Sequence, residues 1–278
     1  MELHDSTIRT IFGALMFLIA ATSMAGYAIY GLAIWNRKKL QQKTIWVTSL
    51  AMADILMTFQ FIVVAVASLR STWPFGNFEC QVSALISLAG GFVAIASITW
   101  IAIDRYYQAC KPEKFGVNYG FFLGCVWFLS LLAAALPAFG FGSYEHASKD
   151  TVVCLLDLDD GKANRGYVMT VALIWFVYPV VKMFLYYHKL AQESKSPHLV
   201  ARLVPVVFLL CYTPYALFAA LQVTVGLGSV PVWISVAVHL LPKLLSAVNP
   251  YIYMQSDPEL LQACKDVISW KSEEKKEK

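Results

Sequence analysis

Apolar positions gather into seven long stretches that short polar connections separate. The stretches run approximately over residues 11–35, 45–69, 81–103, 120–142, 167–190, 201–225 and 230–254. Each is close to the ~20 residues that an α-helix needs to cross ~30 Å of hydrocarbon. Several contain Pro, Gly, Ser or Thr, which membrane helices tolerate because neighbouring helices satisfy the freed backbone groups. The pattern predicts an all-α membrane protein, a single seven-transmembrane helix bundle over residues 1–278.

The polar pattern changes after the seventh stretch. Residues 257–270 form a short amphipathic stretch, which we expect to lie as an eighth helix on the inner membrane face, and residues 271–278 form a charged tail. Cys264 lies in the amphipathic stretch, where it is either a site of palmitoylation or an inert thiol.

Composition excludes a soluble domain with a polar surface. The chain is 58% hydrophobic and only 14% charged. Basic residues concentrate in alternate connections and in the tail, which places the N-terminus outside and the tail in the cytoplasm. This bias accounts for the net charge of +4, so the bilayer is the expected partner and nucleic acid is not. The basic residues of these connections are Arg37, Lys38, Lys39, Lys43, Lys111, Lys114, Lys195, His198 and Arg202.

A lysine, Lys243, lies well inside the seventh apolar stretch. An ionisable group there costs about 2.5–3.5 kcal/mol on insertion scales, so it marks a functional site. Burial favours the neutral amine, which can attack an aldehyde. The alternative, a lysine that snorkels to the interface, requires a position nearer a helix end.

The six cysteines divide by the expected side of the membrane. Cys80 and Cys154 belong to the outer side, where an oxidising compartment permits a disulfide between them. The other four belong to membrane-buried or cytoplasmic positions and should be reduced. No spacing among the six is typical of a metal site.

Short motifs occur in order along almost the whole chain and resemble those of rhodopsin-class G-protein-coupled receptors. The resemblance implies that Asp54, in Leu50-Ala-Met-Ala-Asp54, is the sodium-site aspartate. It also implies that Cys80, after Trp73-Pro-Phe-Gly76, is the disulfide cysteine. The switch motifs correspond to Asp104-Arg105-Tyr106 and Asn249-Pro250-Tyr-Ile-Tyr253. Tyr27 replaces the usual asparagine of the first helix, so we expect a weakened polar network around Asp54.

Lys243 narrows the resemblance to the opsins, because it precedes Pro250 by seven residues. Opsins carry there the lysine that forms a Schiff base with retinal. The resemblance places Gly90 and Gly91 against the polyene, where backbone approaches the ligand closely. It also implies that an aromatic slot holds this flat ligand. Alternatively, aromatic residues at helical spacing form ordinary bundle core. Further positions assigned to the ligand site are Ser83, Ser87, Trp175, Phe176, Phe208, Tyr212 and Tyr215.

Only 35 residues separate Pro179 from Pro214, so the fifth and sixth helices project little beyond the membrane. This short link, together with Tyr212 in place of the usual tryptophan, resembles the retinal-G-protein-coupled-receptor, retinochrome and peropsin group. The group implies a photoisomerase that binds all-trans retinal in the dark and converts it to the 11-cis form in light. Intact switch motifs leave a light-activated sensory opsin with a heterotrimeric G-protein partner as the alternative. A receptor for a non-retinal ligand is a weaker alternative, and a channel or transporter the weakest.

The sequence offers several candidates for the group that compensates the charge of a protonated Schiff base. The position that vertebrate visual opsins fill with glutamate is Ser83 here. Glu145, in the second outer loop, is the first choice, and Asp150 is the other acidic residue nearby. His239 precedes Lys243 by four residues on the same helix face. As a neutral imidazole it can accept a hydrogen bond or relay a proton, or it simply packs with its N–H on a backbone carbonyl.

Overall fold

A computed structural model describes residues 2–35, 37–111, 118–146, 153–158, 161–193, 199–226, 230–255 and 257–274. Within this part of the chain, the helices are α1 (Glu2–Ile34), α2 (Lys38–Lys43), α3 (Ile45–Arg70), α4 (Asn77–Cys110), α5 (Tyr119–Ala135), α6 (Gly161–Ala172), α7 (Tyr178–Glu193), α8 (Leu199–Val225), α9 (Val232–Met254) and α10 (Pro258–Glu274). A 3₁₀ turn, Leu136–Phe139, extends α5, and a π-helical segment, Leu173–Val177, joins α6 to α7.

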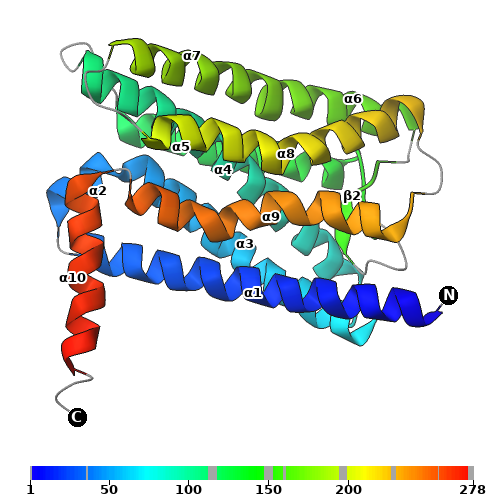
Figure 1. The fold of residues 1–278 in the computed structure, drawn as a ribbon. Coiled ribbons are helices and arrows are strands. Elements are labelled where there is room, and N and C mark those ends of the chain that lie inside the picture. Colours follow the sequence, from blue (N-terminus) through cyan, green and yellow to red (C-terminus); the bar gives the residue numbers. More distant parts are fainter. Residues whose placement is uncertain are drawn as a thin grey trace.

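The long helices run side by side as one bundle, and α10 lies across one end of it (Figure 1). Counting α6, the π-helical segment and α7 as one helix, the described residues form a bundle of seven long helices. The predicted all-α, seven-transmembrane architecture with a short further helix is confirmed. The bundle end that carries α2 and α10 is called the α10 end below.

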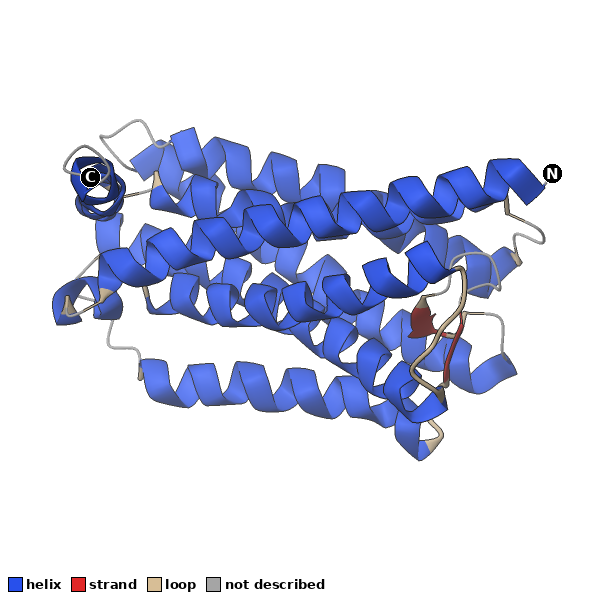
Figure 2. Ribbon diagram, turned by 90° about the horizontal axis from the view of Figure 1, so that it is seen from below, coloured by secondary structure: helices blue, strands red, loops and turns tan. Residues whose placement is uncertain are grey.

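A two-stranded hairpin lies at the opposite end of the bundle, near the N-terminus (Figure 2). Strands β1 (Tyr144–His146) and β2 (Cys154–Leu156) pair antiparallel, with Tyr144 opposite Leu156. A disulfide bond joins Cys80, in the first turn of α4, to Cys154 in β2. The predicted disulfide is confirmed, and it holds the hairpin against the N-terminal end of α4. This opposite end is called the hairpin end below.

Six helices are long and apolar enough to cross a membrane, judged over the described residues: α1, α3, α4, α5, α6–α7 and α8. Helix α9 is not among these six, and its apolar sequence includes Lys243, His239 and Asn249. Its 23 residues still run the length of the bundle beside α1 and α8 (Figure 1).

Side-chain caps explain where two of the helices begin. Asn118 accepts a hydrogen bond from the backbone N–H of Phe121 at 3.1 Å and so caps α5. Asp257 accepts hydrogen bonds from the N–H groups of Glu259 (2.9 Å) and Leu260 (3.2 Å) and caps α10. Each satisfies N–H groups that have no partner within the first turn.

Candidate functional site

A cavity of about 190 Å³ opens inside the bundle, towards the hairpin end. Side chains from α3, α4, α6, α8 and α9 and from the π-helical segment surround it, and Leu155 and Leu156 of β2 close one side. Most of the lining is aliphatic or aromatic. An apolar cavity with few polar groups is the usual form of a small-molecule site.

Lys243 is the one lysine among the described residues that line the cavity. Its Nζ donates a hydrogen bond to the backbone carbonyl of His239 at 3.2 Å and lies 5.9 Å from the centre of the Phe61 ring. No ion pair of Lys243 occurs within the described residues. The amine therefore faces a largely apolar cavity.

His239 lines the same cavity one helical turn before Lys243 and is only 9% exposed. Its Nδ1 lies 2.7 Å from the backbone carbonyl oxygen of Ser235. The ring meets Tyr215 and Phe218 edge to face, with ring centres 5.3 and 5.8 Å apart. These contacts fix the plane of the imidazole.

Four of the five aromatic residues predicted for the ligand site line the cavity: Trp175, Phe176, Tyr212 and Tyr215. Phe208 does not line it. That residue is fully buried behind them and stacks on Tyr212, with ring centres 4.7 Å apart. Phe208 thus supports the wall of the cavity and does not form its surface.

The two adjacent glycines have different surroundings. Gly91 lines the cavity, and a Cβ added there would meet no atom within 4 Å, so it would project into open space. Gly90 instead faces α3, where an added Cβ would lie 2.6 Å from Cγ of Met57. Gly90 permits close packing of α4 on α3, and only Gly91 belongs to the cavity wall.

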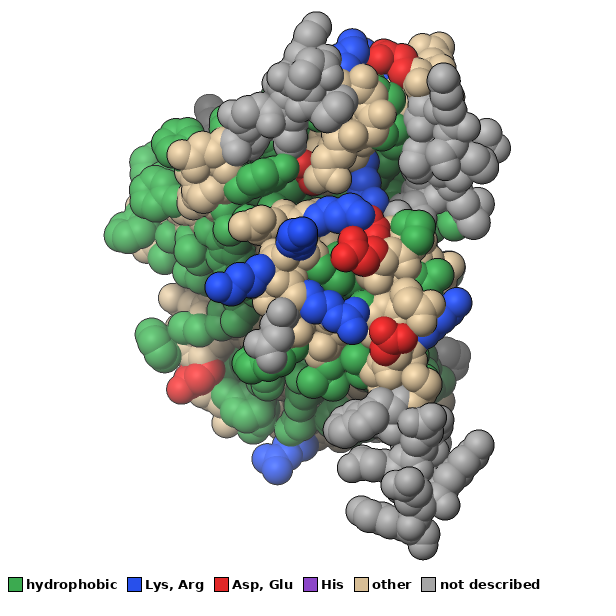
Figure 3. All heavy atoms as spheres, turned by 90° about the vertical axis from the view of Figure 1, so that its left-hand side faces the viewer, with side chains coloured by type: hydrophobic (Ala, Val, Ile, Leu, Met, Phe, Trp, Pro, Cys, Tyr) green, Lys and Arg blue, Asp and Glu red, His purple; other side chains and the backbone are tan. Residues whose placement is uncertain are grey.

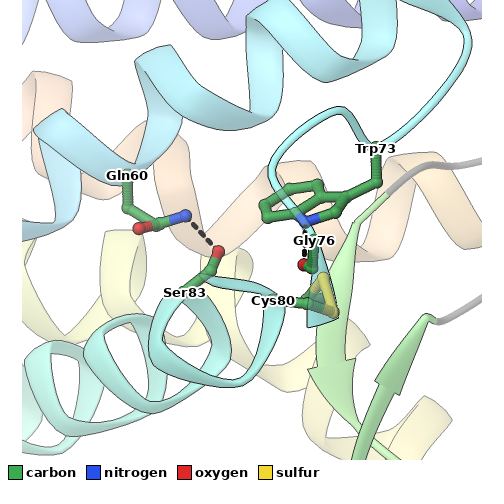
Figure 4. The surroundings of a disulfide bond; sticks show 6 residues. Gln60, Trp73, Gly76, Cys80 and Ser83 are labelled. Atoms are coloured by element: carbon green, nitrogen blue, oxygen red, sulfur yellow. Dashed lines mark hydrogen bonds between the residues drawn. A yellow bond between two sulfur atoms is a disulfide. The ribbon is translucent and has the colours of Figure 1, made fainter. Parts of the chain in front are cut away.

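The two serines predicted for the site also differ in whether they line the cavity. Ser87 lines the cavity. Ser83 lies one turn closer to the disulfide, is buried, and accepts a hydrogen bond from the side-chain amide of Gln60 (Figure 4). Ser83 is therefore part of the contact between α3 and α4 and lies outside the cavity lining.

The hairpin register places the backbone of Glu145 directly opposite Leu155, whose side chain lines the cavity. The side chain of Glu145 lies outside the described part of the structure, as does all of Asp150. Tyr144, next to Glu145, donates a hydrogen bond to the carbonyl of Ala134 at 2.5 Å, and burial raises the pKa of this phenol.

A buried polar network around Asp54 lies next to the cavity. Asp54 accepts hydrogen bonds from Ser246 (2.9 Å), from Asn249 (2.9 Å) and from the Tyr27 hydroxyl. The expectation that Tyr27 weakens this network is wrong. The phenol is long enough to reach across from α1 to Asp54, so it supplies a hydrogen bond in place of the shorter asparagine.

At the α10 end, the Asp104-Arg105-Tyr106 motif bonds to neighbouring helices. Asp104 accepts hydrogen bonds from Tyr119 (2.8 Å) and Gln108 (2.7 Å). The Tyr106 hydroxyl lies 3.0 and 3.1 Å from the two carboxylate oxygens of Glu193, the last residue of α7. Lys111 forms an ion pair with the same carboxylate, at 3.6 Å.

Sequence reasoning missed three residues of these networks. Gln60 and Glu193 carry no pattern that distinguishes them from other polar residues. Ser246 did carry a signal, because its position three residues after Lys243 puts both on one face of α9, and both line the cavity.

Comparison with known proteins agrees with this geometry. Residues 27–253 match the family described as 7 transmembrane receptor (rhodopsin family). The structure superposes on squid rhodopsin with a TM-score of 0.77 and 21% identity, over 95% of this chain and 86% of that one. The chain belongs to the rhodopsin family of seven-transmembrane receptors.

Curated relatives are opsins and opsin-like receptors. The human RPE-retinal G protein-coupled receptor is 27% identical, over 99% of this chain and 98% of that protein. The bovine protein of the same name is 29% identical over 90% of each chain. The blue-sensitive opsin of Anolis carolinensis is 28% identical over 86% of this chain and 74% of its own length.

Proposed function

We propose that the protein is a retinal-binding opsin in which Lys243 holds retinal covalently as a Schiff base. The carrying observation is the Lys243 amine inside an apolar cavity that the disulfide-tied hairpin closes. A primary amine in such surroundings is an uncommon and costly feature unless it reacts with or binds something.

The residues present fit an elongated, flat, apolar ligand. Trp175, Phe176, Tyr212 and Tyr215 offer ring surfaces, and Gly91 leaves open the space that any side chain would fill. These residues would bind and orient the polyene. Leu155 and Leu156 would help to exclude water from the hairpin end of the cavity. Retinal supplies the absorption of light and the double bond that turns.

We infer that the activity is photoisomerisation, with all-trans retinal bound in the dark and converted to 11-cis in light. The support is the short connection from Glu193 at the end of α7 to Leu199 at the start of α8. A connection of this length offers little chain for holding a signalling partner. Two relatives that match over nearly the whole chain bear the name RPE-retinal G protein-coupled receptor.

A light-activated G-protein receptor is the second candidate. The intact Asp104-Arg105-Tyr106 motif, and the Asn249 hydrogen bond to Asp54, favour it because both switch motifs of the receptor family are retained. A heterotrimeric G protein would then be the partner.

The proposed orientation puts the α10 end in the cytoplasm. Lys and Arg side chains are spread over this end (Figure 3), with Arg37 and Lys43 among the basic residues there. The positive-inside rule favours this side for such residues. Protease protection of an epitope tag in sealed vesicles tests the orientation.

Glu145 remains our proposal for the group that compensates a protonated Schiff base. Removal of a nearby anion disfavours the cation. Glu145→Gln should therefore lose the visible band at a lower pH than the wild type does. An unchanged titration would exclude Glu145 and favour Asp150 or His239 as the compensating group.

The decisive experiment is purification with all-trans retinal, illumination, and chromatography of the extracted isomers. We expect accumulation of 11-cis retinal in the wild type, and loss of borohydride-stable retinal and of the visible band in Lys243→Ala. Lys182→Ala is the matched control, because Lys182 also lies in a membrane-spanning helix but outside the cavity lining. Covalent retinal in Lys243→Ala would refute the proposal.

A further inference from the structure

We propose that the Nε2 atom of His239 accepts and returns the proton that the Lys243 nitrogen must lose when it bonds to an aldehyde. This rests on the proposed function, since it concerns how Lys243 becomes attached to its ligand. The two residues line one cavity, one helical turn apart on α9. The Lys243 Nζ already contacts the histidine backbone, 3.2 Å from its carbonyl oxygen.

The hydrogen bond of the other ring nitrogen determines the tautomer of His239. A backbone carbonyl can only accept a hydrogen bond, and the Ser235 carbonyl lies 2.7 Å from Nδ1. Nδ1 therefore carries the proton. A neutral imidazole has a single N–H, so Nε2 carries a lone pair and acts as an acceptor.

The position of the ring makes Nε2 available to the cavity. Nδ1 is turned back to the helix that carries it, so Nε2 lies on the edge of the ring away from that contact. Tyr215 and Phe218 pack edge to face against the ring. The imidazole is thus an acceptor in the same cavity lining as the amine.

Other titratable groups around Lys243 are less suited to move a proton. Tyr212 and Tyr215 line the cavity as phenols, whose neutral oxygens are too weakly basic to take up a proton at neutral pH. Asp54 already accepts hydrogen bonds from Tyr27, Ser246 and Asn249. The side chain of Glu145, from the hairpin, lies outside the described residues.

The proton balance of the step is simple. The neutral amine of Lys243 attacks the aldehyde carbon, a C–N bond forms, and the nitrogen becomes cationic and acidic. Nε2 takes one nitrogen proton and returns it to the aldehyde oxygen. The second nitrogen proton follows, the oxygen leaves as water, and a C=N bond replaces C=O. Histidine ends as it began, which is the behaviour of a general acid–base.

The test uses the protein without retinal and benzaldehyde as the probe. Labelling of Lys243 is stopped at timed intervals with borohydride and measured by peptide mass spectrometry from pH 6 to 9. His239→Phe keeps the ring packing but removes both nitrogens. We expect at least a tenfold lower rate at pH 7, since general acid–base groups contribute ~10²–10⁴.

Two further variants separate the possible roles. His239→Gln can hydrogen-bond but cannot take a proton, so it should react as slowly as His239→Phe. The wild-type rate in either variant would overturn the proposal. His188→Phe, an exposed histidine on α7 outside the cavity, is the matched control and should react as the wild type does. Absence of Lys243 labelling in the wild type would instead count against the reactive lysine, and so against the proposed function itself.

Discussion

Tyr27 shows how one side chain changes the chemistry of a buried network. Its hydroxyl, Ser246 and Asn249 together give the Asp54 carboxylate three donors, from α1 and α9. Asp54 is 1% exposed, so a lost donor is not replaced easily by water. The network therefore ties three helices, α1, α3 and α9, at one buried point.

Removal of this hydroxyl should destabilise the bundle. For Tyr27→Phe we expect a loss of about 1–2 kcal/mol, because the buried carboxylate keeps only two of its donors. This lowers the melting temperature by about 2–8 °C, measurable by thermal unfolding in detergent. Tyr178→Phe removes the hydroxyl of an exposed tyrosine and serves as the control, with little change expected. Equal melting temperatures for Tyr27→Phe and the wild type would contradict the role of the bond.

Residue identity in the cavity could be predicted only in part from the sequence. Lys243 and His239 follow from position on a helix, because residues on one face of a helix reach one space. The sequence could not separate Gly90 from Gly91, or Ser83 from Ser87. Positions on α4 that are adjacent or one turn apart differ in which neighbour they meet. Only the packing of α3 on α4 decides between them.

At the scale of elements, α10 is held to the bundle by charge and by burial. Lys43 of α2 forms an ion pair with Asp257 at 2.5 Å, and Arg37 pairs with Asp266 at 3.6 Å. On α10 itself, the side chains of Leu260, Ala263 and Cys264 are buried. Burial also raises the pKa of the Cys264 thiol to about 11, so this cysteine fits the inert alternative better than a palmitoylation site.

Loss of the Asp257 carboxyl group should loosen α10 alone. Asp257→Ala removes both the cap and the ion pair, and the cap by itself is worth about 1 kcal/mol. Backbone hydrogen exchange should rise in α10 and stay unchanged in α9. Asp266→Asn, which breaks an exposed ion pair, should have an effect below about 0.5 kcal/mol. Equal exchange in the two variants would show that the cap and the Lys43 contact contribute little.

The same contact predicts the pH dependence of α10. Burial alone would raise the pKa of Asp257, but the Lys43 and Leu260 hydrogen bonds outweigh it and leave the pKa below its usual 3.8. A carboxyl group with a lowered pKa stabilises the folded state fully above the unfolded value and loses this contribution as pH falls through the folded one. Protection of α10 should thus be constant from about pH 5 upwards and fall only below about pH 4.

The sequence predicted the long helices and missed the short elements. Hydrophobic length identifies a membrane helix, but α2 has six residues and each hairpin strand has three. Such segments depend on tertiary partners, here the disulfide and the pairing of β1 with β2. The π-helical segment has no periodicity that apolar membrane sequence would reveal.

For the whole molecule, we expect the α10 end to determine which of the two proposed activities dominates. A signalling partner would need an opening between the helix ends on this side. Here Tyr106 of α4 and Glu193 of α7 are joined by hydrogen bonds, and Lys111 pairs with the same carboxylate. The connection to α8 begins directly after Glu193. A short tether limits movement of α8 away from α7, the bonded junction holds α7 to α4, and little area is left for a partner.

We therefore expect weak or absent light-dependent nucleotide exchange on G proteins, together with efficient conversion of all-trans to 11-cis retinal. Both are measured on one preparation, by labelled-nucleotide uptake and by isomer chromatography. Glu193→Gln should weaken the junction with Tyr106 and Lys111. If these bonds suppress coupling, exchange rises in this variant while isomerisation is unchanged, because Glu193 lies outside the cavity lining. Robust exchange in the wild type, with 11-cis retinal as the dark ligand, would reverse the order of the two proposals and make the protein a sensory opsin.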